Sequence, residues 1–366
     1  MLNSGNDIKF GLVAAAFAAA AVRVCGAAAP LKWIDAQTLP VEGRAFAETK
    51  SNFDRLPAEA EGRVTPGVWH LSHHTAGMML RFRTDSDKVA IKWDLLEPEL
   101  DMANMSRTGK SGFDVYRRKT GGKWIFCRSF APAAQKGNSG EVAWTPGDEC
   151  MLNFPLYNGV TALQVGVREG AELTPIVPKE KPIVWYGVST TQGCSASRPG
   201  MAFPAIIARR LDLPHVNLGF SGCGRMEMEM CDYVSRLDAQ VYVIDTPGNL
   251  TLGLMKERYE KFICELHRRR PGVPIVITEQ RVYQSGQKLP RPMGEYLSAM
   301  RDRLVAEGGW DIFYVKSSEM FPVEPDETTA DSPDGHPNDF GMMQLADAYQ
   351  KKIAAALAVA REKQGK

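Results

Sequence analysis

Four residues in the second half of the chain have the types that acyl transfer needs, namely Ser189, Gly222, Asn249 and His336. A serine hydroxyl attacks a carbonyl carbon once a base takes its proton, and histidine does this near neutral pH. The tetrahedral intermediate then needs hydrogen-bond donors aimed at its oxygen. A glycine backbone amide and an asparagine side-chain amide can supply them.

Ser189 follows a segment that predicts a strand ending in a turn. Ile183 to Tyr186 is a short run of β-branched and aromatic residues, which is typical of a buried strand, and Gly187 ends it. A serine just beyond the carboxyl end of a strand lies where ligands bind in open α/β sheets. A loop serine that bonds only its own backbone would look the same locally. The interpretation therefore depends on the residues downstream.

The elements that must position these residues alternate between strand and helix from Pro182 onward. This alternation predicts a parallel sheet with helices on both faces, whose strand ends meet at one edge. The predicted strands are 183–186, 215–220, 241–244, 275–278 and 312–315, and the predicted helices are 203–213, 228–237, 255–270, 293–307 and 340–361.

The first half has a strand-like pattern without a long helical period. Residues 78–84 and 88–96 alternate, and 111–118 and 124–130 flank Lys119-Thr120-Gly121-Gly122, a hairpin signal. Two further strands, 150–156 and 160–167, flank a turn at Tyr157-Asn158-Gly159. Short strands at regular spacing predict an antiparallel sandwich or jelly roll. Residues 173–181, with two prolines and three charges, are typical of a domain linker.

The second half resembles the SGNH hydrolases, also called GDSL-type esterases, over Ile183 to Ala356. Gly187-Val188-Ser189 stands at the first block of that family, Gly222 at the second, Asn249 at the third, and His336 at the catalytic histidine. The resemblance implies a flavodoxin-like three-layer α/β/α domain. It also implies Ser189 as nucleophile, His336 as base, and an oxyanion hole of Ser189 N–H, Gly222 N–H and Asn249.

The chain departs from the family pattern at three places. The first block is GVST, and Leu250 replaces the usual aspartate after the asparagine. The family places an aspartate three residues before the histidine, where this chain has Pro333. A one-residue deletion makes Asp334 the favoured partner of His336, with Asp331 as the rival. A dyad in which a backbone carbonyl orients His336 is the third alternative.

The first half resembles the β-sandwich domain that precedes the hydrolase domain in a bacterial subgroup of that family. The residues that carry this resemblance are His73 to Gly77, Ser111 to Tyr116 and Leu156 to Val160. Members of the subgroup resemble carbohydrate O-deacylases. We therefore expect a β-sandwich over residues 29–178 and the hydrolase domain over 179–366.

The first 28 residues are typical of a secretory signal peptide. Lys9 precedes the apolar run 10–22, and small residues follow at 26–29. The run is too short and alanine-rich for a confident membrane span, so we expect export without stable membrane insertion.

Export permits disulfides, of which Cys127–Cys150 and Cys223 with Cys231 or Cys194 are candidates.

Charge and cysteine spacing narrow the function classes. The formal net charge is +1, with no basic stripe, so nucleic acid is not an expected partner. No CxxC or zinc-like spacing occurs, so we expect no metal, and the acyl-transfer chemistry needs no cofactor. His73 and His74 are adjacent, which favours surface or packing roles over one metal site. Glu279 and Arg281 are expected to pair at the cleft edge.

The sequence thus predicts an exported serine esterase acting on small-molecule or glycan esters, with O-acetyl groups on carbohydrate favoured by resemblance. A lipid or aryl esterase with the same residues is one alternative. A glycan-binding protein with a decayed site is the other.

Overall fold

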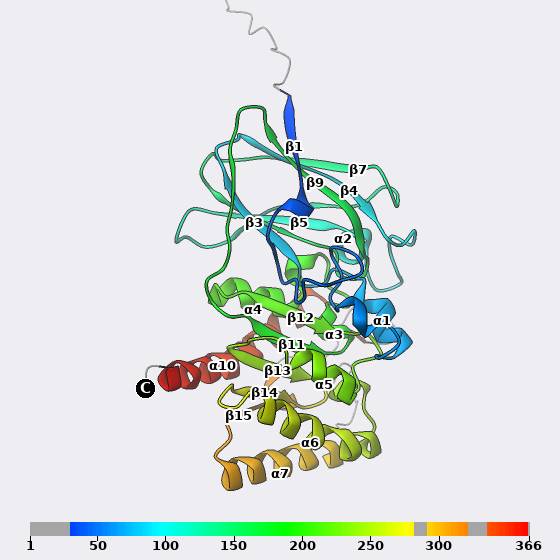
Figure 1. The fold of residues 1–366 in the computed structure, drawn as a ribbon, viewed down its shortest axis with the longest axis vertical. Coiled ribbons are helices and arrows are strands. Elements are labelled where there is room, and N and C mark those ends of the chain that lie inside the picture. The colour runs from blue at the N-terminus through cyan, green and yellow to red at the C-terminus, as the bar shows by residue number, and fades with distance from the viewer. Residues whose placement is uncertain (1–29, 282–290, 321–334, 365–366) are drawn as a thin grey trace, which may run out of the picture. The chain divides into compact units, whose positions relative to one another are not determined.

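The computed structural model describes residues 30–281, 291–320 and 335–364, and Leu31–Lys366 forms one compact unit (Figure 1). The predicted signal peptide, residues 1–28, lies outside the described residues, as do Asp331 and Asp334.

The first half of the compact unit contains two antiparallel sheets. One has the order β1-β9-β4-β7, formed by Leu31–Asp35, Val160–Arg168, Lys88–Leu95 and Asn138–Ala143. The other has the order β10-β3-β8-β5-β6, with β2 beside β3, formed by Leu173–Pro175, Met79–Thr84, Glu149–Asn153, Phe113–Arg118, Ile125–Phe130 and Val41–Glu42. Buried side chains of both sheets share one apolar core, including Phe82, Val115, Trp93 and Val165. The predicted antiparallel sandwich is therefore confirmed.

The chain crosses between the two sheets after β8 and again after β9. The predicted turn at Tyr157-Asn158-Gly159 does not join two paired strands, because β8 pairs with β3 and β5 while β9 pairs with β1 and β4. The turn instead carries the chain from one sheet to the other. Part of the expected linker is a strand, since Leu173–Pro175 pairs with the edge of β3. An edge strand tolerates Pro175, because its missing N–H need not serve the ladder.

Two short helices interrupt the strands of the first half. Helix α1, Pro66–Ser72, is capped by Thr65, whose side chain accepts from Val68 N–H, and Pro66 suits the first helical position. Helix α2 is Arg107–Lys110. Two 3-10 turns, Ala36–Thr38 and Ala58–Ala60, complete this half.

The second half is a parallel sheet with helices on both faces. The strand order β12-β11-β13-β14-β15 is formed by His215–Gly219, Ile183–Gly187, Val241–Asp245, Ile275–Thr278 and Ile312–Val315. Its helices are α3 Ser189–Gln192, α4 Phe203–Leu211, α5 Met228–Val234, α6 Leu252–Arg269, α7 Arg291–Gly308, α8 Ser317–Met320 and α10 Asp339–Gln364, with 3-10 turns at Pro199–Met201 and Pro247–Asn249. The first of these strands along the chain, β11, lies between β12 and β13 inside the sheet, as the first strand does in flavodoxin-like folds.

Alternating side chains of the strands divide the second half into three layers. Val184 and Tyr186 of β11 pack in one apolar cluster with α5, α6 and α7. Ile183 and Trp185 pack in another with α4 and α10. Successive side chains of a strand point to opposite faces, so helices cover both faces of the sheet. The predicted α/β/α architecture is therefore confirmed.

Both clusters also contain residues of the first half. Leu56 and Val68 pack with the α5–α6–α7 side, and Leu156 and Tyr157 pack with the α4–α10 side. Arg55 reinforces this junction: its buried guanidinium donates to the carbonyl oxygens of Asn217 and Gly219 in β12 at 3.0 and 2.7 Å. The first half is therefore joined to the edge strand of the parallel sheet by apolar and polar contacts.

The six cysteines within the described residues are free, so none of the candidate disulfides is formed. Within that same part of the chain, no helix has both the length and the apolar character to span a bilayer.

Candidate active site

Ser189 begins α3 directly beyond the carboxyl end of β11 and is half-buried. Gly187 permits the tight turn before it, since a Cβ there would lie 2.1 Å from Thr191 Oγ1. The turn presents a hydroxyl that solvent can reach on an otherwise buried segment. This is the placement expected from the sequence.

His336 lies within hydrogen-bond distance of Ser189, although 147 positions separate them in the chain. Ser189 Oγ and His336 Nε2 are 2.7 Å apart. His336 precedes α10, which packs against β13, β14 and β15 and so returns the chain to the parallel sheet. This distance suits proton transfer from a serine to an imidazole.

The loops that carry Gly222 and Asn249 touch the residues just before Ser189. Gly187 is in register with Gly219 of β12 and Asp245 of β13, so all three strands end at the same level. A Cβ on Gly224 would lie 2.2 Å from Gly187 O, and one on Gly248 would lie 3.7 Å from Val188 Cγ2. The two loops therefore flank the Ser189 turn.

Hydrogen-bond donors remain unused in these loops. Asn249 Nδ2 is buried and has no acceptor among the described residues. In the same part of the chain, no backbone carbonyl oxygen accepts from the amides of Ser189 or Gly222. Gly222 has φ +69°, a left-handed conformation that glycine adopts without strain. A buried donor without a partner is costly, so the Asn249 amide is a candidate ligand for a substrate oxygen.

A buried carboxylate supports the Ser189 turn from within the sheet. Asp245 is 0% exposed and accepts from Thr191 Oγ1 at 2.5 Å, Thr278 Oγ1 at 3.0 Å and Tyr349 Oη at 2.9 Å, and it forms an ion pair with Arg281. The sequence-based pairing of Arg281 with Glu279 is wrong. Glu279 instead accepts from Ser317 N–H at 2.6 Å, beside the end of β15.

Residues of the first half also contact the Ser189 turn, and sequence reasoning missed them. Tyr157 Oη donates to Ser189 O at 2.9 Å. Gln192, at the end of α3, donates to Leu156 O at 3.1 Å and lies 3.3 Å from His74 Nδ1. Tyr157 and His74 fell within motifs noted for family resemblance, but no sequence pattern shows contacts across such separations.

Burial shifts the pKa of several groups around this junction. Burial raises the pKa of the Tyr157 hydroxyl well above its usual value, so it stays a donor. Burial lowers the pKa of Arg55 to about 9, which leaves it charged at neutral pH. Burial lowers the pKa of His74, against the opposing effect of Glu97. His215, in β12, has its pKa lowered to about 4 by burial.

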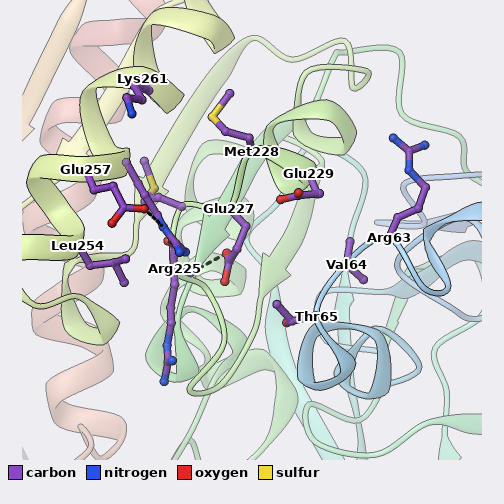
Figure 2. Close-up of a pocket in the computed structure, with 12 residues that line it drawn as sticks. Arg63, Val64, Thr65, Arg225, Glu227, Met228, Glu229, Leu254, Glu257 and Lys261 are labelled. Carbon is purple, nitrogen blue, oxygen red and sulfur yellow. Dashed lines mark hydrogen bonds and ion pairs between the residues drawn. The ribbon is translucent and has the colours of Figure 1, made fainter.

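A surface pocket of about 760 Å³ lies beside the loop that follows Gly222 (Figure 2). Neither Ser189 nor His336 lines it. Its cations and carboxylates nearly balance, so it has no dominant charge for a ligand; they are Arg63, Arg225, Arg258 and Lys261 against Glu227, Glu229 and Glu257.

Two family models match the chain. Residues 180–354 match the GDSL-like lipase/acylhydrolase family, and residues 31–173 match the N-terminus of SGNH hydrolase-type esterases. No curated protein matches the chain at a significant level.

Solved structures show the same fold over most of the chain. A protein from Bacteroides ovatus ATCC 8483 that is described as a GDSL-like lipase is 27% identical, with a TM-score of 0.82 over 90% of this chain and 98% of that one. A salicylyl-acyltransferase of a tetracycline biosynthetic pathway is 19% identical, with a TM-score of 0.74 over 89% and 97%. A family two carbohydrate esterase from Cellvibrio japonicus is 14% identical, with a TM-score of 0.59 over 91% and 99%.

Proposed function

Because residues 180–354 match the GDSL-like lipase/acylhydrolase family, we propose that the protein is a serine esterase that removes O-acyl groups, above all O-acetyl groups, from carbohydrate. The observation that carries the proposal is the 2.7 Å contact between Ser189 Oγ and His336 Nε2. The carbohydrate substrate is supported by the likeness of the fold to a family two carbohydrate esterase.

The mechanism has an acylation and a deacylation step. His336 Nε2 takes the proton of Ser189 Oγ as the oxygen attacks the ester carbonyl carbon. The amides of Ser189 and Gly222 and the Asn249 side chain stabilise the oxyanion. The ester bond then breaks, and His336 gives its proton to the leaving sugar oxygen. Water, deprotonated by His336, next attacks the acyl-enzyme, which releases the carboxylic acid and returns the proton to Ser189.

A carboxylate would orient His336 and stabilise its charged form. Asp334 is the proposed residue, with Asp331 as the rival, and both lie outside the described residues. Replacing each by asparagine separately identifies the partner, because only the partner's loss should lower kcat strongly. The composition of the first 28 residues supports export as part of this proposal.

The test is acetate release from a panel of O-acetylated polysaccharides, together with hydrolysis of p-nitrophenyl acetate, butyrate and longer esters. We expect acetyl esters to be preferred and Ser189→Ala to reduce kcat by about 10⁴-fold or more. An intact fold in Ser189→Ala, checked by thermal unfolding, is the control. A wild-type rate no higher than that of Ser189→Ala on every ester would contradict the proposal and favour a glycan-binding role.

A further inference from the structure

A continuous line of hydrogen bonds leads from the first half of the chain to the loop that carries Gly222. Gln192 is 0% exposed, and its Oε1 accepts from Ser221 N–H at 3.1 Å. Its Nε2 donates to Leu156 O and faces His74 Nδ1. His74 Nε2 in turn lies 2.9 Å from Glu97 Oε1. We propose that Gln192, oriented by His74 and Glu97, is a positioning residue for the Gly222 amide, an inference that rests on the proposed esterase function.

The partners of Gln192 determine which way its amide points. Ser221 N–H is a donor, so it requires the Gln192 oxygen, and Leu156 O is an acceptor, so it requires the nitrogen. If the amide were reversed, its NH2 group would face Ser221 N–H and its oxygen would face Leu156 O, so neither hydrogen bond could form. Gln192 therefore presents an N–H to His74 Nδ1, and that ring nitrogen must accept.

The same reasoning determines the tautomer of His74. With Nδ1 accepting, the ring proton lies on Nε2 and is donated to Glu97. His74 is 3% exposed, and its burial favours this neutral form. Glu97 also lies 3.3 Å from His70 Nε2 and 3.8 Å from Lys110 Nζ. The other groups facing His74 are the ring of His70, Arg55, which donates to the His74 carbonyl oxygen, and the ring of Tyr157.

The cluster of His70, His74 and Glu97 also has ligand atoms within 4.8 Å of one another, as a metal site would. A metal on His74 Nε2 would require the proton to lie on Nδ1. That proton would point at the Gln192 amide, so two donors would oppose each other. The direction of the hydrogen bonds thus favours orientation of Gln192 over metal binding.

The position of Ser221 explains what the line of hydrogen bonds achieves. Ser221 directly precedes Gly222, so fixing its N–H restricts the peptide whose amide faces the developing oxyanion. Gly222 has no side chain, and a Cβ at that position would have no neighbour within 4 Å, so packing around it supplies little restraint. Donors that are already in place stabilise a transition state without the cost of reorganisation.

The experiment compares His74→Phe with His74→Asn in the full chain. Phenylalanine keeps the ring but removes both nitrogens, whereas the asparagine oxygen can take the place of Nδ1 and accept from Gln192. We expect His74→Phe to lower kcat on p-nitrophenyl acetate about tenfold or more, less than the 10²–10³-fold typical of losing a whole donor, with KM nearly unchanged. His74→Asn should recover most of that loss. Gln192→Met, which breaks the line one step later, should match His74→Phe.

His73→Phe is the matched control, because His73 bonds Asp54 at 2.9 Å and stands outside the line. It should leave kcat unchanged. Equal kcat in the phenylalanine and asparagine variants of His74, or a loss confined to KM, would overturn the inference.

A second readout does not depend on turnover. The chain has only six histidines, so ¹⁵N-labelled imidazole spectra can be assigned by single substitutions. We expect His74 to carry its proton on Nε2, and a proton on Nδ1 would refute the proposed line. If wild-type activity instead equals that of Ser189→Ala, the esterase function fails while the tautomer still reports on Gln192.

Discussion

Two buried polar networks hold the turn that carries Ser189, and they differ in chemistry. At the end of β13, the Asp245 carboxylate accepts hydrogen bonds from Thr191, Thr278 and Tyr349 and forms an ion pair with Arg281. From the first half of the chain, neutral groups reach the same turn, since Tyr157 bonds Ser189 O and Gln192 bonds His74. One network is ionic and the other consists mainly of neutral hydrogen bonds.

The difference suggests that the two networks have different roles, one in stability and the other in positioning. A buried charge that loses its partner destabilises the fold strongly, whereas a lost neutral hydrogen bond costs about 0.5–1.5 kcal/mol. The ionic network should therefore govern whether the sheet edge folds. The neutral network should govern how accurately Ser189 and the Gly222 loop are placed.

The largest effect is expected for Asp245→Asn. The substitution keeps the shape but removes the charge that faces Arg281, so the free energy of unfolding should fall by about 3–5 kcal/mol. Chemical denaturation measures this. Asp238→Asn is the control, because its ion pair with Lys181 at 3.0 Å is largely exposed and should contribute under about 1 kcal/mol. Equal losses in the two variants would remove the distinction between the networks.

A smaller effect on the free energy of unfolding is expected when acid protonates His215, at the junction of the two halves. His215 is buried against Gly77, and neither ring nitrogen has a partner among the described residues. Its pKa is lowered from 6.5 to about 4 by burial. Between these values the unfolded chain binds the proton and the folded chain does not. Lowering the pH through this window should therefore reduce the free energy of unfolding by about 3 kcal/mol.

His215→Leu tests this pH dependence, because it removes the titrating ring without breaking a hydrogen bond. Unfolding measured from pH 7 to pH 4 should become flatter in this variant. His267→Leu is the comparison, since that half-buried ring stacks on Trp310 and should change the slope less. A wild-type slope retained in His215→Leu would assign the acid sensitivity to other groups.

The predictable part of the molecule is the part whose signals are local. Ser189, Gly222 and Asn249 each follow a strand closely in sequence, so strand ends alone predicted that their loops would meet. Tyr157-Asn158-Gly159 was predicted only as a turn, because a turn signal does not say which sheet the next strand joins. The acidic partner of His336 stays a prediction.

The supporting contacts were not predictable for a physical reason. Gln192 lies 118 residues from His74, and Arg55 lies 162 residues from Asn217. No periodicity connects such pairs, because they depend on how the first half packs against β12. Arg281 was assigned to Glu279 by proximity in sequence, yet the burial of Asp245 at the end of β13 decided its partner.

The smallest effect is expected from removing the Tyr157 hydroxyl, which tests whether its bond to Ser189 O positions the Ser189 turn or only stabilises the fold. Tyr157→Phe removes the bond to Ser189 O, and Tyr242→Phe removes a similar bond of 2.5 Å to Leu237 O, near the amino end of β13. Both variants should lose about 1 kcal/mol of stability. Only Tyr157→Phe should also lower kcat, by about three- to tenfold, because only that hydroxyl bonds the turn that carries Ser189. Thermal unfolding and steady-state kinetics on both variants decide the point. An equal kcat in the two would show that the first half of the chain stabilises the Ser189 turn without positioning it.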